Sequence, residues 1–295
     1  MSAHKAGFVN IIGNPNVGKS TLMNALVGER LSIITSKAQT TRHRILGIVN
    51  GDDFQVVISD TPGIIKPAYA LQESMMKSVR GALDDADVLI YMVEVGEKGL
   101  KDETFLERIR KSKVPMLLLI NKIDISDQQT LEGQVGYWEE VLPKAEIFPI
   151  SALERFNIQP VFERILELLP EAPPYFPKDQ LTDRPERFFV SEVIREKILR
   201  HYKKEIPYSV EIEVEQFEET DELIRIEAVI MVERDSQKGI IIGHKGTALK
   251  RVGSEARKDL EAFFDKKLFL KLFVKVNKNW RSDARQLRRF GYDPK

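Results

Sequence analysis

The first 170 residues alternate between short apolar runs and amphipathic stretches. The apolar runs, rich in β-branched and large aliphatic residues, lie at 8–12, 45–49, 55–59, 88–93, 116–120 and 146–150. Apolar residues three or four apart at 101–112 and 158–169 predict helices between and after these runs. The alternation predicts an α/β fold, a mostly parallel, doubly wound sheet with helices on both faces. The gap at 50–54 is too short for a crossover, so we expect one antiparallel hairpin.

The pattern changes after residue 184, where helices and strands no longer alternate. A helix is predicted at 185–202 and strands at 208–217, 224–233 and 268–276. In the first strand strict alternation places the apolar side chains on one face and the glutamates on the other, with the inward set being Val210, Ile212 and Val214. Helices are expected at 236–242, after the glycine-rich loop 243–246, and in a basic tail at 280–292. This order predicts a smaller α+β domain.

A proline-rich stretch separates the two patterns. Residues 170–179, PEAPPYFPKD, contain four prolines, which neither continue a helix nor pair in the centre of a sheet. We therefore expect a first domain at 1–171, a linker at 172–183 and a second domain at 184–295.

Composition bears on the cellular compartment of the protein and on the charge of its partner. The 295 residues include no cysteine, which excludes disulfides and thiolate metal sites and agrees with a cytoplasmic protein. No apolar run is long enough to span a membrane. The net charge is zero, but residues 236–295 hold 16 Lys and Arg against 6 Asp and Glu. This basic end predicts either a polyanionic partner or a solvated surface.

A phosphate-binding loop follows the first predicted strand. Residues 13–20, GNPNVGKS, match G-x-x-x-x-G-K-[ST] between a strand and a helix, the context that this motif requires. Glycines let backbone N–H groups point at phosphate oxygens at the start of the helix. We expect Lys19 to bridge the β- and γ-phosphates and Ser20 to hold Mg²⁺. This motif alone predicts a nucleoside triphosphate but not the base.

Guanine is predicted by the sequence NKID at 121–124, directly after a buried strand. The carboxylate of Asp124 accepts two hydrogen bonds from guanine, whereas adenine offers the wrong groups, so the aspartate discriminates against ATP. Asn121 and Lys122 support this loop. The segment 150–152, ISA, would add a backbone N–H to the base pocket. An ATPase is the alternative that Asp124 argues against.

The sequence DTPG at 60–63 predicts the γ-phosphate side of the site. Asp60 is placed to reach Mg²⁺ through water, and the Gly63 N–H is placed to meet the γ-phosphate. The polar segment 37–44 is expected to be a mobile switch loop whose threonine ligates Mg²⁺ only with GTP bound. Thr41 is our choice, with Thr40 left open. We expect Lys19, Thr41 and Gly63 to act in catalysis.

The predicted sites can be stated in full. The nucleotide-binding residues are Gly13, Asn14, Pro15, Asn16, Val17, Gly18, Lys19, Ser20, Thr21, Asp60, Thr61, Pro62, Gly63, Ile64, Asn121, Lys122, Ile123, Asp124, Ser151 and Ala152, and the metal ligands are Ser20, Thr41 and Asp60. Ile64 occupies the place where many switch GTPases carry a water-orienting glutamine. An isoleucine cannot orient water, so slow GTP hydrolysis to GDP is predicted.

The second glycine-rich loop, GHKG at 243–246, lacks the spacing of a phosphate-binding loop. It is a G-x-x-G between two predicted helices, as in KH domains, where such a loop clamps the sugar–phosphate backbone of about four nucleotides. The surrounding element order fits a type II KH domain, the basic end contains this loop, and lysines occur along the strand 268–276. The predicted RNA-binding residues are Gly243, His244, Lys245, Gly246, Lys250 and Arg251. A plain turn between helices is the alternative.

The chain resembles a known family along its whole length. GNPNVGKSTLMNAL with QTTRH resembles the Era/TrmE-type branch of P-loop GTPases, and TDRPERFFVSEVIREK and RSDARQLRRFGYDPK resemble the Era family of bacterial GTPases with a C-terminal KH domain. The resemblance implies GTP and GDP as ligands, binding to the 3′ end of 16S ribosomal RNA, and assistance in assembling the 30S ribosomal subunit. It also implies peripheral association with the inner membrane. Asn16 matches a position that holds K⁺ in similar GTPases, so we treat K⁺ stimulation as a hypothesis.

Two further functions are left open as alternatives. The chain could be a scaffold that binds GTP and RNA without hydrolysis, which Ile64 would allow. It could also be an RNA-processing enzyme, although no histidine pair or carboxylate cluster supports one. We expect a monomer with no DNA partner.

Overall fold

The computed structural model describes residues 4–100 and 102–292. The chain divides into two compact units, one made of residues 4–183 without 69–71, and the other of residues 184–292 together with 69–71. None of the helices in these described ranges is both long and apolar enough to cross a membrane.

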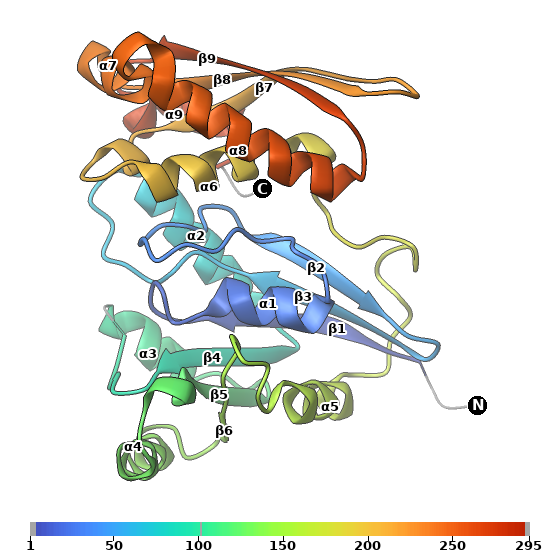
Figure 1. The fold of residues 1–295 in the computed structure, drawn as a ribbon. Coiled ribbons are helices and arrows are strands. Elements are labelled where there is room, and N and C mark those ends of the chain that lie inside the picture. The colour runs from blue at the N-terminus through green and yellow to red at the C-terminus, as the bar shows by residue number, and fades with distance from the viewer. Residues whose placement is uncertain (1–3, 101, 293–295) are drawn as a thin grey trace. The chain divides into compact units, whose positions relative to one another are not determined.

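The first unit is built on a six-stranded sheet with the order β2-β3-β1-β4-β5-β6 (Figure 1). The strands are β1 (Lys5–Ile12), β2 (Ile45–Asn50), β3 (Phe54–Asp60), β4 (Val88–Glu94), β5 (Met116–Asn121) and β6 (Glu146–Pro149). All neighbours pair in parallel except β2 and β3, which form the expected antiparallel hairpin. The predicted mostly parallel sheet is therefore confirmed.

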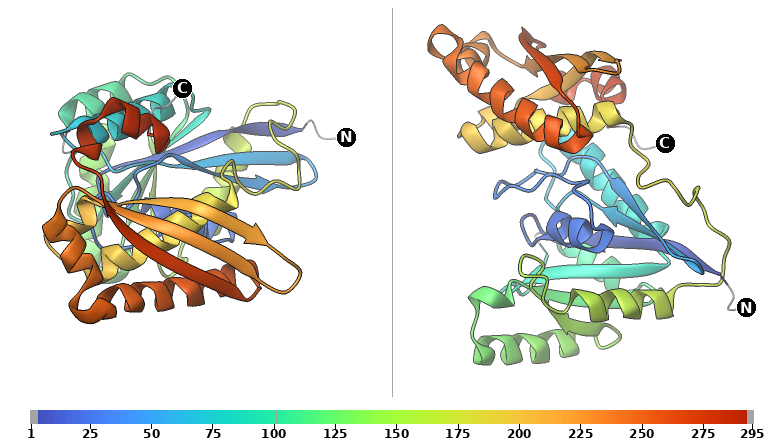
Figure 2. Two further views of the ribbon diagram at one scale, coloured as in Figure 1. Left: turned by 90° about the horizontal axis from the view of Figure 1, so that it is seen from above. Right: turned by 45° about the vertical axis from the view of Figure 1, so that its right-hand side comes forward.

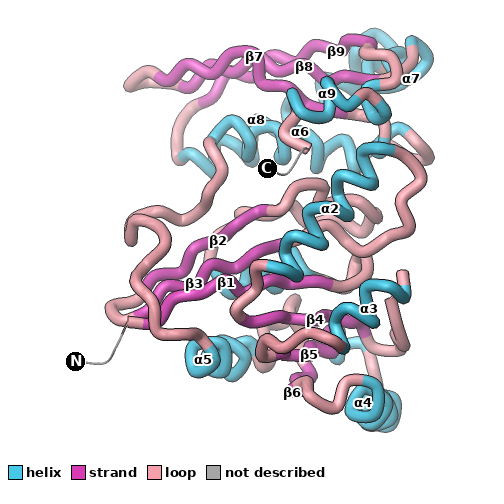
Figure 3. The backbone as a smooth tube through the Cα atoms, turned by 180° about the vertical axis from the view of Figure 1, so that it is seen from behind, coloured by secondary structure: helices cyan, strands magenta, loops and turns pink. Residues whose placement is uncertain are grey.

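Helices cover both faces of this sheet. They are α1 (Lys19–Val27), α2 (Ala70–Asp84), α3 (Glu103–Arg110), α4 (Gln128–Val141) and α5 (Ile158–Leu168), with a short 3-10 helix at Ile123–Ile125. Figure 1 shows α1 and α5 in front of the sheet, and Figure 3, drawn from behind, shows α2 and α3 on the other face. Because helices lie on both sides, every residue from Val88 to Val93 in the central β4 is fully buried.

The segment predicted as a linker runs along the first unit. The backbone N–H groups of Tyr175 and Phe176 donate to Gln55 Oε1 at 2.7 and 2.9 Å. The N–H of Ile48 donates to the carbonyl of Leu181 at 2.8 Å, so the chain here follows the edge of β2. Its prolines agree with this place, because an edge strand tolerates residues without an N–H.

The second unit is a three-stranded sheet with helices packed on it. Its elements are α6 (Glu186–His201), β7 (Glu211–Glu219), β8 (Ile224–Val232), α7 (Asp235–Ile242), α8 (Thr247–Phe264), β9 (Leu268–Val276) and α9 (Ala284–Arg289), with 3-10 helices at Ile206–Tyr208, His244–Gly246 and Trp280–Ser282. The order is β7-β8-β9, with β7 antiparallel and β9 parallel to β8. Figure 2 shows α6 and α8 along one face of this sheet. Between them lies a core that includes Ile194, Ile226, Ala256 and Leu260.

The alternation predicted for β7 fails in its second half. The register slips between Val214 and Gln216, so Phe217 rather than residue 216 packs against the core. An extra residue on one strand shifts all later side chains to the opposite face. The outward glutamates are also less exposed than expected, since Glu211 is buried and accepts a hydrogen bond of 2.6 Å from Tyr292 Oη.

The basic tail differs from the predicted helix over 280–292. It consists of a 3-10 turn and the short helix α9, and Trp280 is fully buried with its Nε1 donating to the Ser209 carbonyl at 3.1 Å. Arg281 and Arg289 form ion pairs with Glu233 and Glu213. The tail therefore docks onto its own domain, as an ordinary packing helix does.

Candidate nucleotide site and RNA-binding groove

The phosphate-binding loop lies between β1 and α1, as its motif requires. Gly18, which caps α1, has φ 104°, and a Cβ there would lie 2.3 Å from Nδ2 of Asn121. That amide in turn donates to the Val17 carbonyl at 2.7 Å. Glycine at this position thus permits both the left-handed backbone and the close approach of the NKID segment to the loop.

The predicted phosphate-binding lysine points back onto its own loop. Lys19 is buried, and its Nζ donates to the carbonyls of Gly13 and Asn14 at 3.2 and 2.8 Å. Burial lowers the pKa of Lys19 to about 8, although the negative charges of Asp60 and Glu97 act to raise it. The loop therefore holds an ammonium group whose solvation is poor, and an anionic phosphate is the partner that would restore favourable interactions.

The three predicted metal ligands meet at one point. Ser20 Oγ donates to Asp60 Oδ2 at 2.7 Å and lies 3.0 Å from Thr41 Oγ1, which itself donates to Asp60 Oδ2 at 3.3 Å. Thr40 instead lies beside Thr35 and the Lys37 carbonyl, both 2.6 Å away. Of the two threonines left open by the sequence, the structure brings Thr41 to this cluster.

One oxygen of the Asp60 carboxyl group can still accept a hydrogen bond or bind a cation. Asp60 is fully buried, and its Oδ1 has no hydrogen-bond partner within the described ranges. Burial raises the pKa of this carboxyl group, although the hydrogen bonds that it accepts and the charge of Lys19 act to lower it. A buried carboxylate oxygen without a donor is costly. A divalent cation would satisfy it, and hydroxyl and carboxylate oxygens are ligands that Mg²⁺ accepts.

The DTPG segment packs tightly behind the loop. Thr61 Oγ1 donates to the Ile11 carbonyl at 2.6 Å, and the N–H of Ile64 donates to the Gly13 carbonyl at 3.0 Å. A Cβ on Gly63 would lie 2.6 Å from Cα of Pro15, so only glycine fits. Ile64 is completely buried, hence its side chain cannot reach a water molecule in the site.

Asn121 joins three segments that the sequence predicts to contact the nucleotide. Besides its bond to Val17, its Oδ1 accepts a hydrogen bond of 2.9 Å from the Ala152 N–H. Ser151 Oγ donates to Asp124 Oδ1 at 2.6 Å, which orients the predicted base-reading carboxylate. The ISA segment was expected to offer a backbone N–H to the base, and here the N–H of Ala152 is bonded to Asn121.

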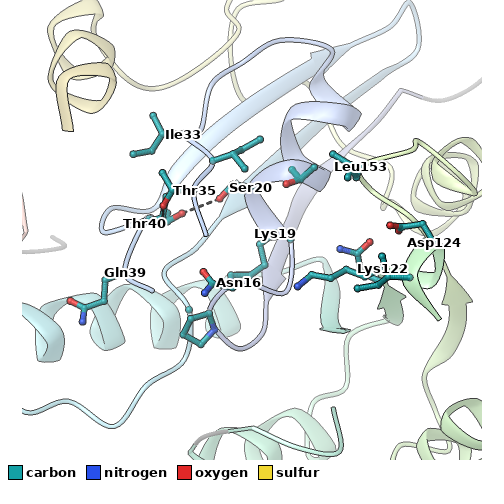
Figure 4. Close-up of a pocket in the computed structure, with 18 residues that line it drawn as sticks. Asn16, Lys19, Ser20, Ile33, Thr35, Gln39, Thr40, Lys122, Asp124 and Leu153 are labelled. Carbon is teal, nitrogen blue, oxygen red and sulfur yellow. Dashed lines mark hydrogen bonds between the residues drawn. The ribbon is translucent and has the colours of Figure 1, made fainter. Parts of the chain in front are cut away.

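These segments surround a cavity of about 310 Å³ (Figure 4). Figure 4 shows Lys122 and Asp124 on one side of Lys19 and Ser20, and Thr35 and Thr40 on the other. The predicted residues that line the cavity are Pro15, Asn16, Gly18, Lys19, Ser20, Thr21, Thr41, Gly63, Asn121, Lys122 and Asp124. The other predicted residues, Gly13, Asn14, Val17, Asp60, Thr61, Pro62, Ile64, Ile123, Ser151 and Ala152, do not line it.

The cavity is also lined by Thr40, the alternative to Thr41 that the sequence left open, and by Gln39 of the predicted switch loop. Lining residues outside every predicted segment are Ile33, Ile34, Thr35, Ile125 and Leu153. Ile125 and Leu153 are 77% and 74% exposed. Their positions directly after NKID and ISA are the signal that could have identified them.

Asn16 connects the phosphate-binding loop to the residue directly before the predicted switch loop. Its Nδ2 donates to the Ser36 carbonyl at 2.9 Å, and its backbone adopts φ 68°. The amide of Asn16, which lines the cavity, thus lies beside a backbone carbonyl at the start of the switch loop.

The second glycine loop forms the end of a groove on the second unit. Residues 244–246 make a 3-10 turn between α7 and α8, with Gly243 and Gly246 at φ 71° and 78°. A groove of about 470 Å³ beside it is lined by Gly246, Leu249, Lys250, Gly253, Ser254, Arg257, Leu270, Lys271 and Leu272. Gly246 and Lys250 were predicted, whereas Gly243, His244, Lys245 and Arg251 do not line it.

The charges near this groove are partly neutralised. Arg251 is paired with Glu255 at 3.0 Å, and the strand lysines Lys271 and Lys275 bond Glu227 and Glu215 at 3.1 and 2.8 Å. The lysines counted in favour of RNA binding therefore already have acidic neighbours. Lys250, by contrast, is exposed and has no side-chain partner in the part of the chain that the structure describes.

Comparisons with known proteins agree with this pair of sites. A family model described as 50S ribosome-binding GTPase matches residues 8–122, and a KH domain model matches residues 205–281. The chain is 45% identical to the GTPase Era of Staphylococcus haemolyticus over 294 residues, 99% of this chain and 98% of that protein. It is also 45% identical to the GTPase Era of Alkaliphilus metalliredigens, covering 99% and 100% of the two chains. The chain belongs to the GTPase Era family.

Solved structures of Era have the same fold. Era in complex with MgGDPNP and nucleotides 1506–1542 of 16S ribosomal RNA matches with a TM-score of 0.93 and 37% identity, over 99% of this chain and 100% of that one. An Aquifex aeolicus Era variant bound to GDP.AlF4⁻ matches with a TM-score of 0.93 and 38% identity. This match covers 98% of this chain and 100% of that one. The family and the fold, a P-loop GTPase domain followed by a KH domain, are thus confirmed.

Membership of the Era family decides between the functions left open. The chain is a GTPase that binds guanine nucleotides, which argues against an ATPase and against a scaffold without hydrolysis. An RNA-processing activity gains no support from these comparisons.

Proposed function

We propose that this chain is a GTP-dependent RNA-binding protein that acts in assembly of the small ribosomal subunit. The observation that carries the proposal is the joint presence, on a chain of the Era family, of the nucleotide cavity and the KH groove. The related Era bound both MgGDPNP and a segment of 16S ribosomal RNA. In this proposal the first domain is 1–171, the linker 172–183 and the KH domain 184–295.

Magnesium is the cation that we propose for the cluster of Ser20, Thr41 and Asp60. The mutual distances of 2.7 to 3.3 Å and the unpartnered Oδ1 of Asp60 support this assignment. When bound, Mg²⁺ neutralises charge on the β- and γ-phosphates. Ser20 and Thr41 would supply hydroxyl oxygens, while Asp60 would supply a carboxylate fixed by burial.

Slow hydrolysis with help from K⁺ is the mechanism that we propose. The buried Ile64 leaves no side chain directly after Gly63 to orient water, so positioning and electrostatic stabilisation must come from Lys19, Gly63 and bound cations. Asn16 and the Ser36 carbonyl together offer oxygen atoms suited to K⁺. We expect faster turnover in KCl than in NaCl at equal ionic strength, and equal rates would contradict the K⁺ assignment.

Guanine recognition by Asp124 is tested by exchanging its carboxylate. Asp124→Asn keeps an acceptor but presents a donor to the guanine N1–H, so GTP affinity should fall and xanthosine triphosphate affinity should rise. The bond from Ser151 shows that the side chain is held in place, so the exchange should not reorganise the loop. Unchanged GTP affinity would contradict the assignment.

Single-stranded RNA from the 3′ end of 16S ribosomal RNA is the proposed ligand of the KH groove. The turn 243–246 would clamp the sugar–phosphate backbone, and the bases would lie over the apolar floor of Leu249, Leu270 and Leu272. Lys250 would pair with a phosphate. The acidic partners of the strand lysines restrict the phosphate contacts to the α8 side of the groove.

The test places a charge in the loop at the glycine with the more open surroundings. A Cβ on Gly246 meets no atom within 4 Å, whereas one on Gly243 would lie 2.6 Å from Ala248 Cβ, so Gly246→Asp adds only the strain of a side chain at φ 78°. Gly28→Asp, at φ 84° with equally open space on an exposed turn of the first unit, adds the same charge and a similar backbone strain as a control. We expect Gly246→Asp to weaken binding of a 16S 3′-end RNA by at least about tenfold, as the added carboxylate repels the clamped phosphate.

Measuring RNA affinity with GDP and with a non-hydrolysable GTP analogue adds the nucleotide dependence. Tighter binding with the analogue would indicate a nucleotide-gated clamp, and equal binding would indicate two independent sites. Lys250→Ala should also reduce the slope of log affinity against log salt by about 1, while Lys271→Ala should change it less. Equal RNA affinity of Gly246→Asp and the Gly28→Asp control would contradict the clamp.

Three further expectations complete the proposal, of which the membrane association comes from the family resemblance. They are a monomeric state, a cytoplasmic location with peripheral association at the inner membrane, and no binding of DNA. They stay predictions, which sedimentation, vesicle flotation and competition with DNA would test.

A further inference from the structure

Glu97 lies next to the phosphate-binding loop although it belongs to none of the nucleotide-binding motifs. It follows β4 in the turn 94–97, where its N–H donates to the Glu94 carbonyl at 3.0 Å and Gly96 adopts φ 85°. These features are typical of a type II turn. The turn places the carboxylate of Glu97 against the loop that holds Lys19.

Both carboxylate oxygens of Glu97 accept hydrogen bonds. Oε1 accepts from Asn14 Nδ2, and Oε2 accepts from the Glu94 N–H at 3.2 Å. Asn14 is buried, and its backbone carbonyl accepts the 2.8 Å hydrogen bond from Lys19 Nζ. A chain of contacts therefore runs from Glu97 through one residue of the loop to the phosphate-binding lysine.

The turn that carries Glu97 is itself fixed from α4. Gln134, which is buried, accepts from the Gly96 N–H at 2.8 Å and donates to the carbonyls of Glu94 and Glu97 at 3.0 and 2.9 Å. The side chain of Glu94 is paired with Lys122 of the NKID segment. The same turn thus contacts the phosphate-binding and the base-reading parts of the site.

We infer that Glu97 is a positioning residue for nucleotide binding, which acts through Asn14 to hold the phosphate-binding loop and its lysine in place. The inference rests on the proposed role of residues 13–20 in binding phosphates. Because that loop would contact the phosphates shared by GDP and GTP, loss of Glu97 weakens both nucleotides alike. The effect falls on binding rather than on the turnover of bound GTP.

Protonation of Glu97 offers a second readout. Burial raises the pKa of this carboxyl group, with the nearby Glu94 raising it further and the hydrogen bonds and Lys19 opposing the shift. A raised pKa means that Glu97 takes up its proton at a higher pH than an exposed glutamate does. Nucleotide affinity should therefore fall at a higher pH than the titration of an exposed glutamate would give, and this loss should be absent when residue 97 cannot titrate.

The experiment compares two variants of Glu97 with a matched control in the full chain. Glu97→Ala removes both acceptors, and Glu97→Gln keeps an acceptor for Asn14 but removes the charge. Glu103→Gln removes the same charge from an exposed side chain in the first turn of α3. Dissociation constants for GDP and a GTP analogue are measured from pH 5.5 to 8, together with single-turnover hydrolysis at saturating GTP.

We expect Glu97→Ala to weaken both nucleotides about tenfold at pH 8, which corresponds to about 1.4 kcal/mol. Glu97→Gln should weaken the binding of both nucleotides less than Glu97→Ala does, and its affinity should fall less than that of the wild type as the pH is lowered. Glu103→Gln should match the wild type. A wild-type pH profile for Glu97→Gln, or an effect confined to turnover, would overturn the inference. Failure of the wild-type chain to bind guanine nucleotides would instead overturn the proposed function.

Discussion

Replacing Gly18 by alanine should cost far more than its single added methyl group suggests. Gly18 adopts φ 104°, a region that costs an L-residue about 1–2 kcal/mol. The new Cβ would also lie 2.3 Å from Asn121 Nδ2, a distance at which one of the two must move. Moving Asn121 breaks its 2.7 Å hydrogen bond to the Val17 carbonyl.

The structure allows the two contributions to be separated. Gly28, at the other end of α1, has φ 84° with no atom within 4 Å of an added Cβ. Gly28→Ala therefore incurs the backbone strain alone, about 1–2 kcal/mol. Gly18→Ala should lower the free energy of unfolding by about 1–3 kcal/mol more than this strain does, because a buried amide and a buried carbonyl lose their partner.

A double-mutant cycle tests the assignment of the excess to Asn121. Urea unfolding of the nucleotide-free chain, followed by circular dichroism, gives the free energy of unfolding, and fluorescence titration gives the affinity for GDP. In an Asn121→Ala background the clashing amide is absent, so adding Gly18→Ala should cost only about as much as Gly28→Ala. The GDP affinity of Gly18→Ala should fall with its stability, since Asn121 also bonds the Ala152 N–H.

Two outcomes would refute this reasoning. Equal destabilisation by Gly18→Ala and Gly28→Ala would mean that the loop accommodates the methyl group without displacing Asn121. Strict additivity of Gly18→Ala and Asn121→Ala would mean that the excess cost arises elsewhere, for example against Met92, whose Cε lies 3.4 Å from the added Cβ.

Three further substitutions test other parts of the structure. Gly63→Ala should reduce single-turnover GTP hydrolysis about 100-fold, with a smaller effect on GDP affinity, since its Cβ would displace Pro15 and misplace the γ-phosphate contact. Tyr292→Phe should lower the free energy of unfolding by about 1–3 kcal/mol by removing the buried hydrogen bond to Glu211, and an unchanged melting temperature would contradict the docking of the tail. Leu260→Ala should cost about 2–5 kcal/mol in thermal unfolding, because this leucine is fully buried between α8 and the sheet.

The sequence predicted most of the fold because strands, helices and tight turns depend mainly on residues that are close together in the chain. Six apolar runs became the six strands of the first sheet, and the short gap at 50–54 became the predicted hairpin. The helices α2 and α4 were not named, although each follows a segment of the nucleotide site. Their moderate amphipathicity makes them weaker signals than the strands around them.

The failures come from contacts between elements. The bulge after Val214 arises in the pairing with the next strand, β8, and the burial of Glu211 depends on Tyr292, 81 residues away. The role inferred for Glu97 depends on Asn14, 83 residues away. No spacing rule marks such a glutamate, since its turn contains no repeated or motif-like pattern. Motifs predicted the groups that would meet the nucleotide, whereas the residues that hold those groups in place are visible only in the structure.

The charge of the second unit illustrates the same limit and changes how RNA binding should be understood. Residues 236–295 carry a large excess of basic residues, but residues 184–292 together hold 24 Lys and Arg against 19 Asp and Glu. The sheet glutamates come from the earlier part of this unit and pair with basic residues of the later part, such as Lys275 with Glu215. About half of the excess is therefore balanced within the unit. Salt dependence of RNA binding should then reflect a few phosphate contacts near Lys250 and the loop 243–246, rather than the whole basic segment.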